Sequence, residues 1–245
     1  MPPLTAKPYL RSVQIDPQAD IDPQRYPFTI PAVRDLGVLE PHPDVTFFVG
    51  ENGAGKSTVL EAIAVALGLP AEGGSPFVHR AQLEVSPLHR VLKIARGWRQ
   101  PGYAYFLRAE SLYNVFTYLD EVAKEPFSPP PPELHLRSHG EAFMEVLQGF
   151  SGDGLYLLDE PEAALSPNRQ LAALTVIDQL VKQGAQFIIA THSPILLAYP
   201  RAKILSFDGT GIAEISYEDT EHYAVTRDFL NHYPRRLEQL LGEED

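Results

Sequence analysis

The sequence predicts an α/β fold in which helices flank a mostly parallel core sheet. Short apolar runs alternate with stretches of helical periodicity, a pattern typical of parallel sheets. A glycine-rich loop also lies between one apolar run and the helix pattern that follows it, a common connection in α/β folds. Both observations come from local spacing alone.

Three apolar runs have the length and composition of strands that are buried on both faces. They occupy residues 45–49, 155–158 and 187–190. Helices are expected near residues 57–67, 111–123, 141–148, 167–183, 195–198 and 220–241. Further strands are expected at residues 9–15 and 103–107, with a hairpin at residues 202–207 and 211–217. Residues 88–99 fit either a strand pair or a helix.

Length and composition fit one globular domain of 245 residues. We expect a core lobe at about residues 1–70 and 150–217, a middle lobe at about 71–149, and a C-terminal helix. The formal net charge of −12 argues against a surface that coats DNA or anionic lipid as a whole. Cysteine is absent, which excludes disulfides and thiolate metal sites. Neither a secretion signal nor a membrane span is evident, so we expect a cytoplasmic protein without stable membrane insertion.

Residues 50–57 read GENGAGKS and match G-x-x-x-x-G-K-[ST] in full, after a predicted strand and before a predicted helix. Glycines let successive N–H groups turn toward phosphate oxygens, and the helix dipole favours the same anion. Lys56 is expected at the β- and γ-phosphates, and the Ser57 hydroxyl at Mg²⁺. The sequence therefore predicts an ATP and Mg²⁺ site. Its expected nucleotide contacts are Gly50, Asn52, Gly53, Ala54, Gly55, Lys56, Ser57 and Thr58.

Two carboxylates follow the second buried strand, and a histidine follows the third. Asp159 is expected to orient the Mg²⁺ shell, and Glu160 to polarise the attacking water. An ordinary helix cap before Pro161 is the alternative, which the neighbouring phosphate loop disfavours. His192 is expected to contact the γ-phosphate or the water, because ligands bind beyond the carboxyl ends of parallel strands.

The motifs GENGAGKST, LLDEPEAALSP and IIATHSP resemble those of ABC-type ATPases in the branch of the SMC, RecF-like and OLD-like proteins. The chain is most similar to stand-alone bacterial members often labelled "AAA family ATPase". The resemblance covers nearly the whole chain and implies a P-loop NTPase fold with an ABC-ATPase-like head and an antiparallel β subdomain. It also implies ATP hydrolysis, with Glu160 and His192 as the catalytic pair.

Residues 136–141 read LRSHGE and resemble the ABC signature, with His139 in place of a glycine. In this family the signature meets the γ-phosphate held by a second protomer, so the resemblance implies an ATP-dependent homodimer. It assigns Ser138, Gly140 and Glu141 to nucleotide binding across that interface. A helix capping box is the other explanation of the same residues.

The chain departs from the family pattern in three places. Ser166 replaces the aspartate of the D-loop. The glutamine of the Q-loop is missing, and Glu110 is a candidate contact to Mg²⁺ or its water in its place. The tyrosine that stacks on adenine is not assignable, and Arg11 or a residue between Arg25 and Arg34 are the candidates for that role.

Basic residues gather between positions 79 and 108, with Trp98, Tyr103 and Tyr105 among them. The segment fits a surface for nucleic acid or an acidic partner. A solvated sheet edge facing the acidic body is the interpretation we favour. The basic residues are Arg80, Arg90, Lys93, Arg96, Arg99 and Arg108.

Three functions are compatible with these observations. The first is an ATPase that couples hydrolysis to a DNA or protein partner. The second is the nucleotide-binding subunit of a membrane transporter, against which the missing glutamine and the unusual signature weigh. The third is a non-hydrolysing, nucleotide-dependent switch or scaffold in a defence or toxin–antitoxin system. The intact Glu160 and His192 weigh against a pure scaffold.

Overall fold

The computed structural model describes residues 7–75, 85–109 and 139–242, and the helix expected over residues 111–123 lies outside these ranges. Within them, six strands form a central sheet in the order β4-β5-β6-β2-β7-β8. Five strands run parallel, and β8 runs antiparallel to β7. The predicted fold class is confirmed. The strands are β4 (Tyr103–Arg108), β5 (Gly154–Asp159), β6 (Gln186–Ala190), β2 (Val45–Val49), β7 (Ala202–Asp208) and β8 (Gly211–Ile215).

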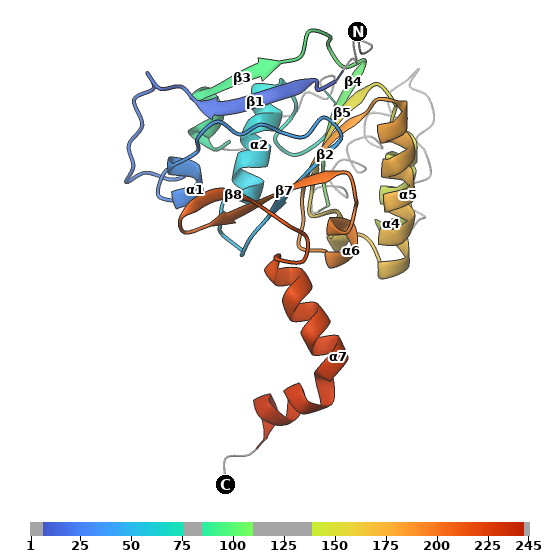
Figure 1. Cartoon of the computed structure of the whole chain (residues 1–245). Helices are drawn as coiled ribbons and strands as arrows, with labels where there is room; N and C mark the ends of the chain where they lie inside the picture. The colour runs from blue at the N-terminus through green and yellow to red at the C-terminus, as the bar shows by residue number, and fades with distance from the viewer. Residues whose placement is uncertain (1–6, 76–84, 110–138, 243–245) are drawn as a thin grey trace, which may run out of the picture.

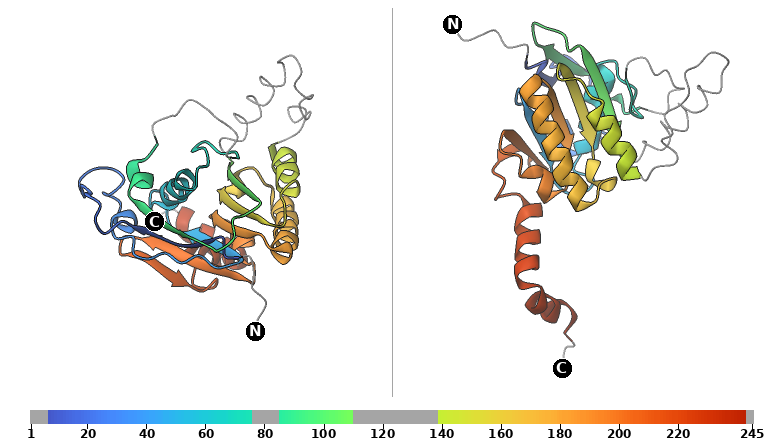
Figure 2. Two further views of the ribbon diagram at one scale, coloured as in Figure 1. Left: turned by 90° about the horizontal axis from the view of Figure 1, so that it is seen from above. Right: turned by 90° about the vertical axis from the view of Figure 1, so that its right-hand side faces the viewer.

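Helices cover both faces of this sheet (Figure 1, Figure 2). Successive residues of a strand point to opposite faces, so β2 places Phe47 in one core cluster and Phe48 in the other. Burying each such side chain contributes about 1.5–3 kcal/mol, which explains why these strands are apolar throughout. One face is covered by α4 (His139–Gln148), α5 (Pro167–Gln183) and α6 (Pro194–Leu197), and the other by α1 (Pro31–Arg34) and α2 (Lys56–Ala66).

A small antiparallel sheet joins β1 (Leu10–Ile15) to β3 (Leu92–Arg96) on the α2 side of the molecule. The ambiguous stretch at residues 88–99 forms the end of a short 3₁₀ helix, η1 (Pro87–Arg90), followed by β3. This sheet is the antiparallel part that the sequence predicts. β1 belongs to the predicted core lobe and β3 to the predicted middle lobe, and the two strands pair with each other. The boundary between the two lobes stays a prediction.

The register of the central sheet aligns the carboxyl ends of neighbouring strands. Arg108 at the end of β4 lies opposite Asp159 at the end of β5. Asp159 in turn lies opposite Ala190 at the end of β6, and Phe48 of β2 pairs with Ala190 from the other side. The loops after these strands therefore meet at one edge, where open α/β sheets bind their ligands.

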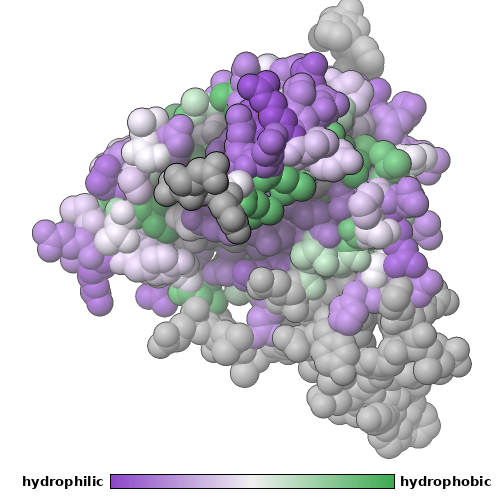
Figure 3. Space-filling view, turned by 90° about the horizontal axis from the view of Figure 1, so that it is seen from below, coloured by the Kyte–Doolittle hydropathy of each residue, from purple (hydrophilic) through white to green (hydrophobic). Residues whose placement is uncertain are grey.

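The last helix, α7 (Glu221–Leu241), projects away from the body (Figure 1). None of its residues is buried, although its N-cap residue, Thr220, is fully buried. The helix is kinked at His232, close to Pro234, because proline removes a helical hydrogen bond and crowds the preceding turn. Seen from below, hydrophobic residues lie at the molecular surface beside hydrophilic ones (Figure 3). The exposed apolar residues of α7 are Val225, Phe229, Leu230, Tyr233, Leu237, Leu240 and Leu241.

Candidate functional site

The glycine-rich loop connects β2 to α2 and needs glycine for two physical reasons. Gly50 and Gly55 have φ angles of 138° and 100°, a region that favours glycine. A Cβ atom on Gly50 would also lie 2.2 Å from the carbonyl oxygen of Phe207, and one on Gly55 would lie 2.9 Å from Val33. The loop thus fits closely between β7 and α1, with its backbone turned around the start of α2.

Lys56 extends back over this loop. Its ammonium donates hydrogen bonds to the carbonyl oxygens of Gly50 and Glu51, both at 2.9 Å. Burial lowers the pKa of Lys56, while the carboxylates of Glu160 and Asp159 oppose that shift. A buried ammonium beside a glycine-rich loop at the start of a helix is a strong site for phosphate oxygens.

Ser57 and Asp159 meet at the sheet edge. The Ser57 hydroxyl donates to Oδ1 of Asp159 at 2.8 Å, and Asp159 is buried. Arg108 lies 3.3 Å from Oδ2 of Asp159 and ion-pairs with Glu61 at 2.8 Å. A hydroxyl and a carboxylate oxygen at this distance suit Mg²⁺, which usually takes one or two protein oxygens together with water and phosphate. The donor set at Ser57 and Asp159 fits the predicted metal.

Glu160 has an unusual backbone conformation. Its φ of 49° is the only positive value at a non-glycine residue among the described parts of the chain. Its N–H donates to the carbonyl oxygen of Ala190, which joins the end of β5 to β6. Such left-handed residues cost energy and often occur at functional sites. Here the conformation accompanies a partly exposed carboxylate that helps line a cavity with Lys56 and Ser57.

His192 follows β6 and faces Glu160, with Nε2 lying 3.8 Å from the nearer carboxylate oxygen. This Nε2 is the only buried side-chain polar atom in the described ranges without a hydrogen-bond partner. Burial and the charge of Lys56 lower the pKa of His192, whereas Glu160 raises it. The neutral ring is therefore favoured near pH 7, and its Nε2 lies on the side that faces Glu160.

Two side chains that the sequence did not single out hold His192 in place. Glu162, in the short helix η3 (Pro161–Ala163), accepts from the His192 N–H and from the Thr191 hydroxyl. Burial raises the pKa of Glu162. His222, in the first turn of α7, contacts the other ring nitrogen, with its Nε2 at 2.7 Å from Nδ1 of His192.

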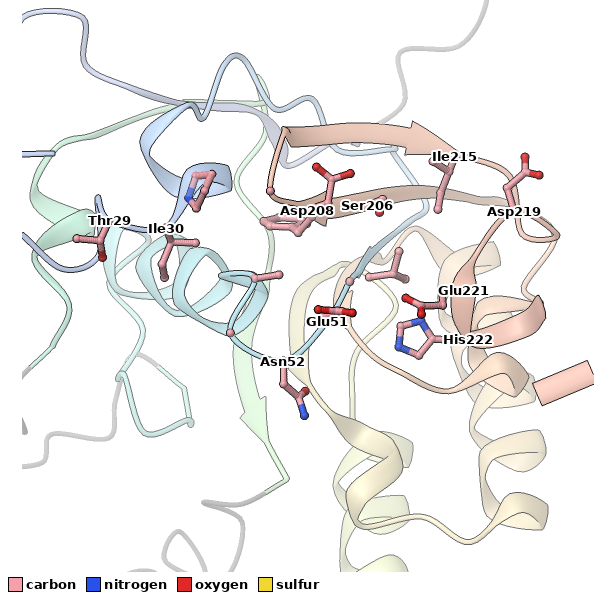
Figure 4. Close-up of a pocket in the computed structure, with 17 residues that line it drawn as sticks. Thr29, Ile30, Glu51, Asn52, Ser206, Asp208, Ile215, Asp219, Glu221 and His222 are labelled. Carbon is pink, nitrogen blue, oxygen red and sulfur yellow. The ribbon is translucent and has the colours of Figure 1, made fainter. Parts of the chain in front are cut away.

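Two neighbouring cavities border the phosphate loop and share Ile30, Asn52 and Gly53. One has a volume of about 620 Å³ and lies between α1, the β7–β8 hairpin and the start of α7 (Figure 4). The other has a volume of about 360 Å³ and includes Tyr26. Residues of the predicted site that line one or both cavities are Gly50, Asn52, Gly53, Ala54, Gly55, Lys56, Ser57, Thr58 and Glu160.

Tyr26 lies in the segment for which the sequence left the adenine contact open. Its ring is 60% exposed, and its hydroxyl is 3.3 Å from the Thr58 hydroxyl. Arg11, the other candidate, lines neither of these cavities. Tyr26 is thus the aromatic residue that the fold brings to the end of the phosphate loop.

The signature segment is described only in part, because Ser138 lies outside the described residues, as does the candidate metal contact Glu110. Gly140 and Glu141 lie in the first turn of α4 and pack against α5. A Cβ on Gly140 would lie 2.3 Å from Arg169, whose guanidinium is 3.1 Å from the Glu141 carboxylate. Neither residue lines the cavities at the phosphate loop of its own chain.

The basic segment forms several contacts with acidic groups of the same chain. Lys93 pairs with Asp16 at 2.7 Å, and Arg108 pairs with Glu61 and Asp159. Trp98 is 69% exposed. Arg80 lies outside the described residues. These ion pairs support the interpretation of a solvated edge for part of the segment.

Sequence reasoning missed Arg108 as a site residue, and it missed Glu162 and His222. Arg108 is the last residue of β4, yet only the register of β4 on β5 reveals its contact with Asp159. Glu162 lies inside the DEPEAAL motif and could have been noticed there. His222 carries no sequence signal, since its partner lies 30 residues away.

Residues 30–85 match the family described as "AAA domain". Residues 128–198 match the family "AAA domain, putative AbiEii toxin, Type IV TA system". These segments contain the phosphate loop and the motifs after β5 and β6. The fold matches a solved SMC head bound to the C-winged helix domain of ScpA, with 14% identity, a TM-score of 0.50, and coverage of 86% of this chain and 99% of that one. The chain thus matches AAA-domain family models in two segments and shares the fold of an SMC head.

The chain is also similar to two curated ATP-binding proteins. It is 26% identical to the ribose import ATP-binding protein RbsA of Rhodopirellula baltica over 75% of the chain. It is 27% identical to the energy-coupling factor transporter ATP-binding protein EcfA2 of Methanospirillum hungatei over 80% of the chain. The chain spans only 40% and 55% of the lengths of these relatives. Among its described helices, none combines the length and hydrophobicity that crossing a membrane requires.

Proposed function

We propose that this ATPase pairs with a second copy around two ATP molecules and couples their hydrolysis to a DNA or protein partner. The observation that carries the proposal is the convergence of Lys56, Asp159, Glu160 and His192 at one edge of the sheet. The signature residues Gly140 and Glu141 line neither cavity at this edge. A composite site, closed by the signature of a second copy, accounts for both facts.

In this site each residue has a distinct task. The loop N–H groups and Lys56 hold the β- and γ-phosphates. Ser57 and Asp159 would hold Mg²⁺, which would supply positive charge against the charge that develops on the phosphates. Glu160 accepts a proton from the water that attacks the γ-phosphorus, and ADP departs as the bond to the bridging oxygen breaks. His192 lies next to Glu160 and donates to the γ-phosphate from Nε2.

Tyr26 is the residue that we assign to the base of the nucleotide. An exposed ring beside the loop offers a flat apolar surface, and stacking on such a ring contributes about 1–3 kcal/mol per base. Its contact with Thr58 ties the ring to the first turn of α2. The assignment links the proline-rich segment before α1 to nucleotide binding.

The second candidate is a nucleotide-dependent switch in a toxin–antitoxin pair. The match of residues 128–198 to a putative AbiEii toxin family favours it. The transporter relatives suggest a third role, as an ATP-binding subunit beside a membrane protein. All three functions use the same nucleotide site and differ in the partner.

The proposal is tested with Glu160→Gln, which retains shape but removes the base. We expect turnover to fall about 10³-fold. We also expect the variant to form a dimer, with twice the monomer mass in solution, when ATP and Mg²⁺ are added. Adding Ser138→Arg to this variant should abolish the doubling. Ser151→Arg is the matched control, because Ser151 is exposed and lies near the opposite end of β5.

Turnover is then measured with and without duplex DNA. Stimulation supports a DNA partner, whereas an unchanged rate with ATP-dependent pairing supports a protein partner. A Glu160→Gln variant that hydrolyses ATP at the rate of the unaltered protein would refute the base assignment. A variant that binds ATP but stays monomeric would refute the composite site.

A further inference from the structure

His192 is held by two different parts of the molecule. Its backbone N–H is fixed by Glu162, and the residues on either side are fixed by the body as well. Thr191 donates to Glu162, and Ser193 donates to the buried Gln170 of α5. The main chain around the histidine is therefore anchored to η3 and α5.

The imidazole ring has a separate partner, His222, which belongs to α7. The distance of 2.7 Å between Nδ1 of His192 and Nε2 of His222 is that of a hydrogen bond, so one of the two nitrogens carries the shared proton. Only two arrangements are available to a pair of neutral rings. In one, His192 donates from Nδ1. In the other, His222 donates from Nε2 and His192 keeps its proton on its own Nε2.

The surroundings favour the second arrangement. Nε2 of His192 faces the Glu160 carboxylate at 3.8 Å, and an N–H there is attracted by that negative charge, whereas a lone pair would be repelled. A protonated Nε2 can also donate to a phosphate oxygen, whereas an unprotonated one cannot. His222 thus selects the form of His192 that binds an anion.

The contact between His222 and His192 depends on the position of the first turn of α7. No residue of α7 is buried, so the position of His222 is set by the first turn and by its cap. Thr220 accepts from the Tyr223 N–H and donates to the Tyr217 carbonyl oxygen, which fixes that turn to the hairpin segment. Displacing the start of α7 would remove the partner of Nδ1 while leaving the backbone of His192 in place.

We propose that His222 is a positioning residue for ATP hydrolysis. Through its hydrogen bond to Nδ1 it fixes the ring and the tautomer of His192, and it makes hydrolysis depend on the placement of the first turn of α7. The inference rests on the proposed hydrolysis of ATP at Glu160 and His192, and it holds whether the protein works as a dimer or as a monomer.

The test compares three substitutions of His222. His222→Ala removes the donor, and we expect kcat to fall about tenfold with a KM for ATP within about twofold, since one hydrogen bond is lost. His222→Gln keeps an N–H donor on a side chain of similar length and should restore most of kcat. His222→Glu offers only an acceptor, favours a proton on Nδ1, and should lower kcat at least as much as alanine. His232→Ala, in the exposed part of α7, is the matched control.

A purely structural role is separated from positioning by the tautomer itself. In protein labelled with ¹⁵N-histidine, we expect the His192 signals to show a proton on Nε2 and none on Nδ1. In His222→Ala the two nitrogens should shift toward an average of both tautomers. Thr220→Ala, which weakens the helix cap, should lower kcat in the same direction but less than His222→Ala.

The pH profile of kcat gives an independent readout. The groups that face the pair are Glu160 after β5, Glu162 in η3, Lys56 in α2 and Glu221 in α7. Opening the pair to water in His222→Ala relieves the burial that lowers the pKa of His192, so the acid limb should move to higher pH. His222→Gln should keep the acid limb close to its original position.

Equal kcat and unchanged ¹⁵N signals in His222→Ala would overturn the inference, as would a loss that glutamine and glutamate restore equally well. If His222→Ala unfolds, the comparison of glutamine with glutamate still decides, because both keep a long polar side chain. Glu160→Gln in the same assay separates the hypothesis that Glu160 is the base from the hypothesis that His222 positions His192. If Glu160→Gln abolishes activity and His222→Ala does not, the base assignment stands and the positioning role is refuted.

Discussion

The phosphate loop and α7 meet at one place in the molecule, yet they are built in opposite ways. The loop lies between two buried strands and a packed helix, and its key lysine is only 4% exposed. The helix α7 has no buried residue and leaves the body after its first turn. His192 stands between them, with its backbone held by the body and its ring held by α7. The proposed catalytic residues thus lie on the buried part, while one contact to His192 comes from the exposed part.

The difference suggests how hydrolysis can be tied to an external event. A site held only by buried elements responds to little besides its ligands. Displacing an exposed helix with an apolar surface costs little free energy. If α7 is displaced, the contact that its first turn makes with His192 changes as well. The largest effects should therefore come from the loop and the smallest from the outer turns of α7.

The first prediction tests the rigid side of this comparison. Lys56→Ala should weaken ATP binding about 100-fold, because hydrogen bonds from a charged donor contribute about 1.5–3 kcal/mol each. Titration with a fluorescent ATP analogue gives the dissociation constant. Lys93→Ala removes an exposed lysine of β3 and serves as the control. An affinity that Lys56→Ala leaves unchanged would contradict the placement of the phosphates on this loop.

The sequence predicts the rigid side well because its signals are local. Residues 45–49 alone fix a doubly buried strand, and the glycines at positions 50 and 55 fix the loop that follows. The partners of Asp159 needed the sheet register, since Arg108 lies on a different strand and its contact depends on which strands are neighbours. Strand order is a long-range property that local periodicity does not contain.

The exposed side is predicted less completely. The sequence predicts a helix at residues 220–241, and the structure has one at Glu221–Leu241. Its amphipathic pattern would normally indicate packing on the body, but the helix projects outward instead. The contact of His222 with His192 joins two elements that share no motif, so spacing could not reveal it.

The second prediction concerns the contact between the two sides. Burial lowers the pKa of both His192 and His222 below the ordinary value of 6.5. Below about pH 6.5 the unfolded chain therefore binds more protons than the folded one, and the free energy of unfolding should fall as the pH decreases. Urea unfolding from about pH 8 to about pH 5 measures this loss.

His222→Gln is the variant that isolates the pair in this experiment. It removes one of the two titrating rings, so it should flatten the pH dependence relative to the unaltered protein. Glu162, whose pKa is raised by burial, contributes with the opposite sign at pH values above 4.5. That contribution is present in both proteins and cancels in the difference. Identical slopes in the two proteins would contradict a buried neutral pair.

The last prediction tests the exposed side, where the smallest effect is expected. Leu230 is 67% exposed on α7, so Leu230→Gln should change the free energy of unfolding of the isolated chain by no more than about 0.5 kcal/mol. Leu147→Ala, at a fully buried position of α4, should cost about 2–5 kcal/mol in the same urea titration. A loss of more than about 1 kcal/mol from Leu230→Gln would mean that α7 packs on something in solution. Repeating the titration at several protein concentrations then decides what covers it, because contact with a second copy makes the midpoint rise with concentration, whereas contact within one chain does not.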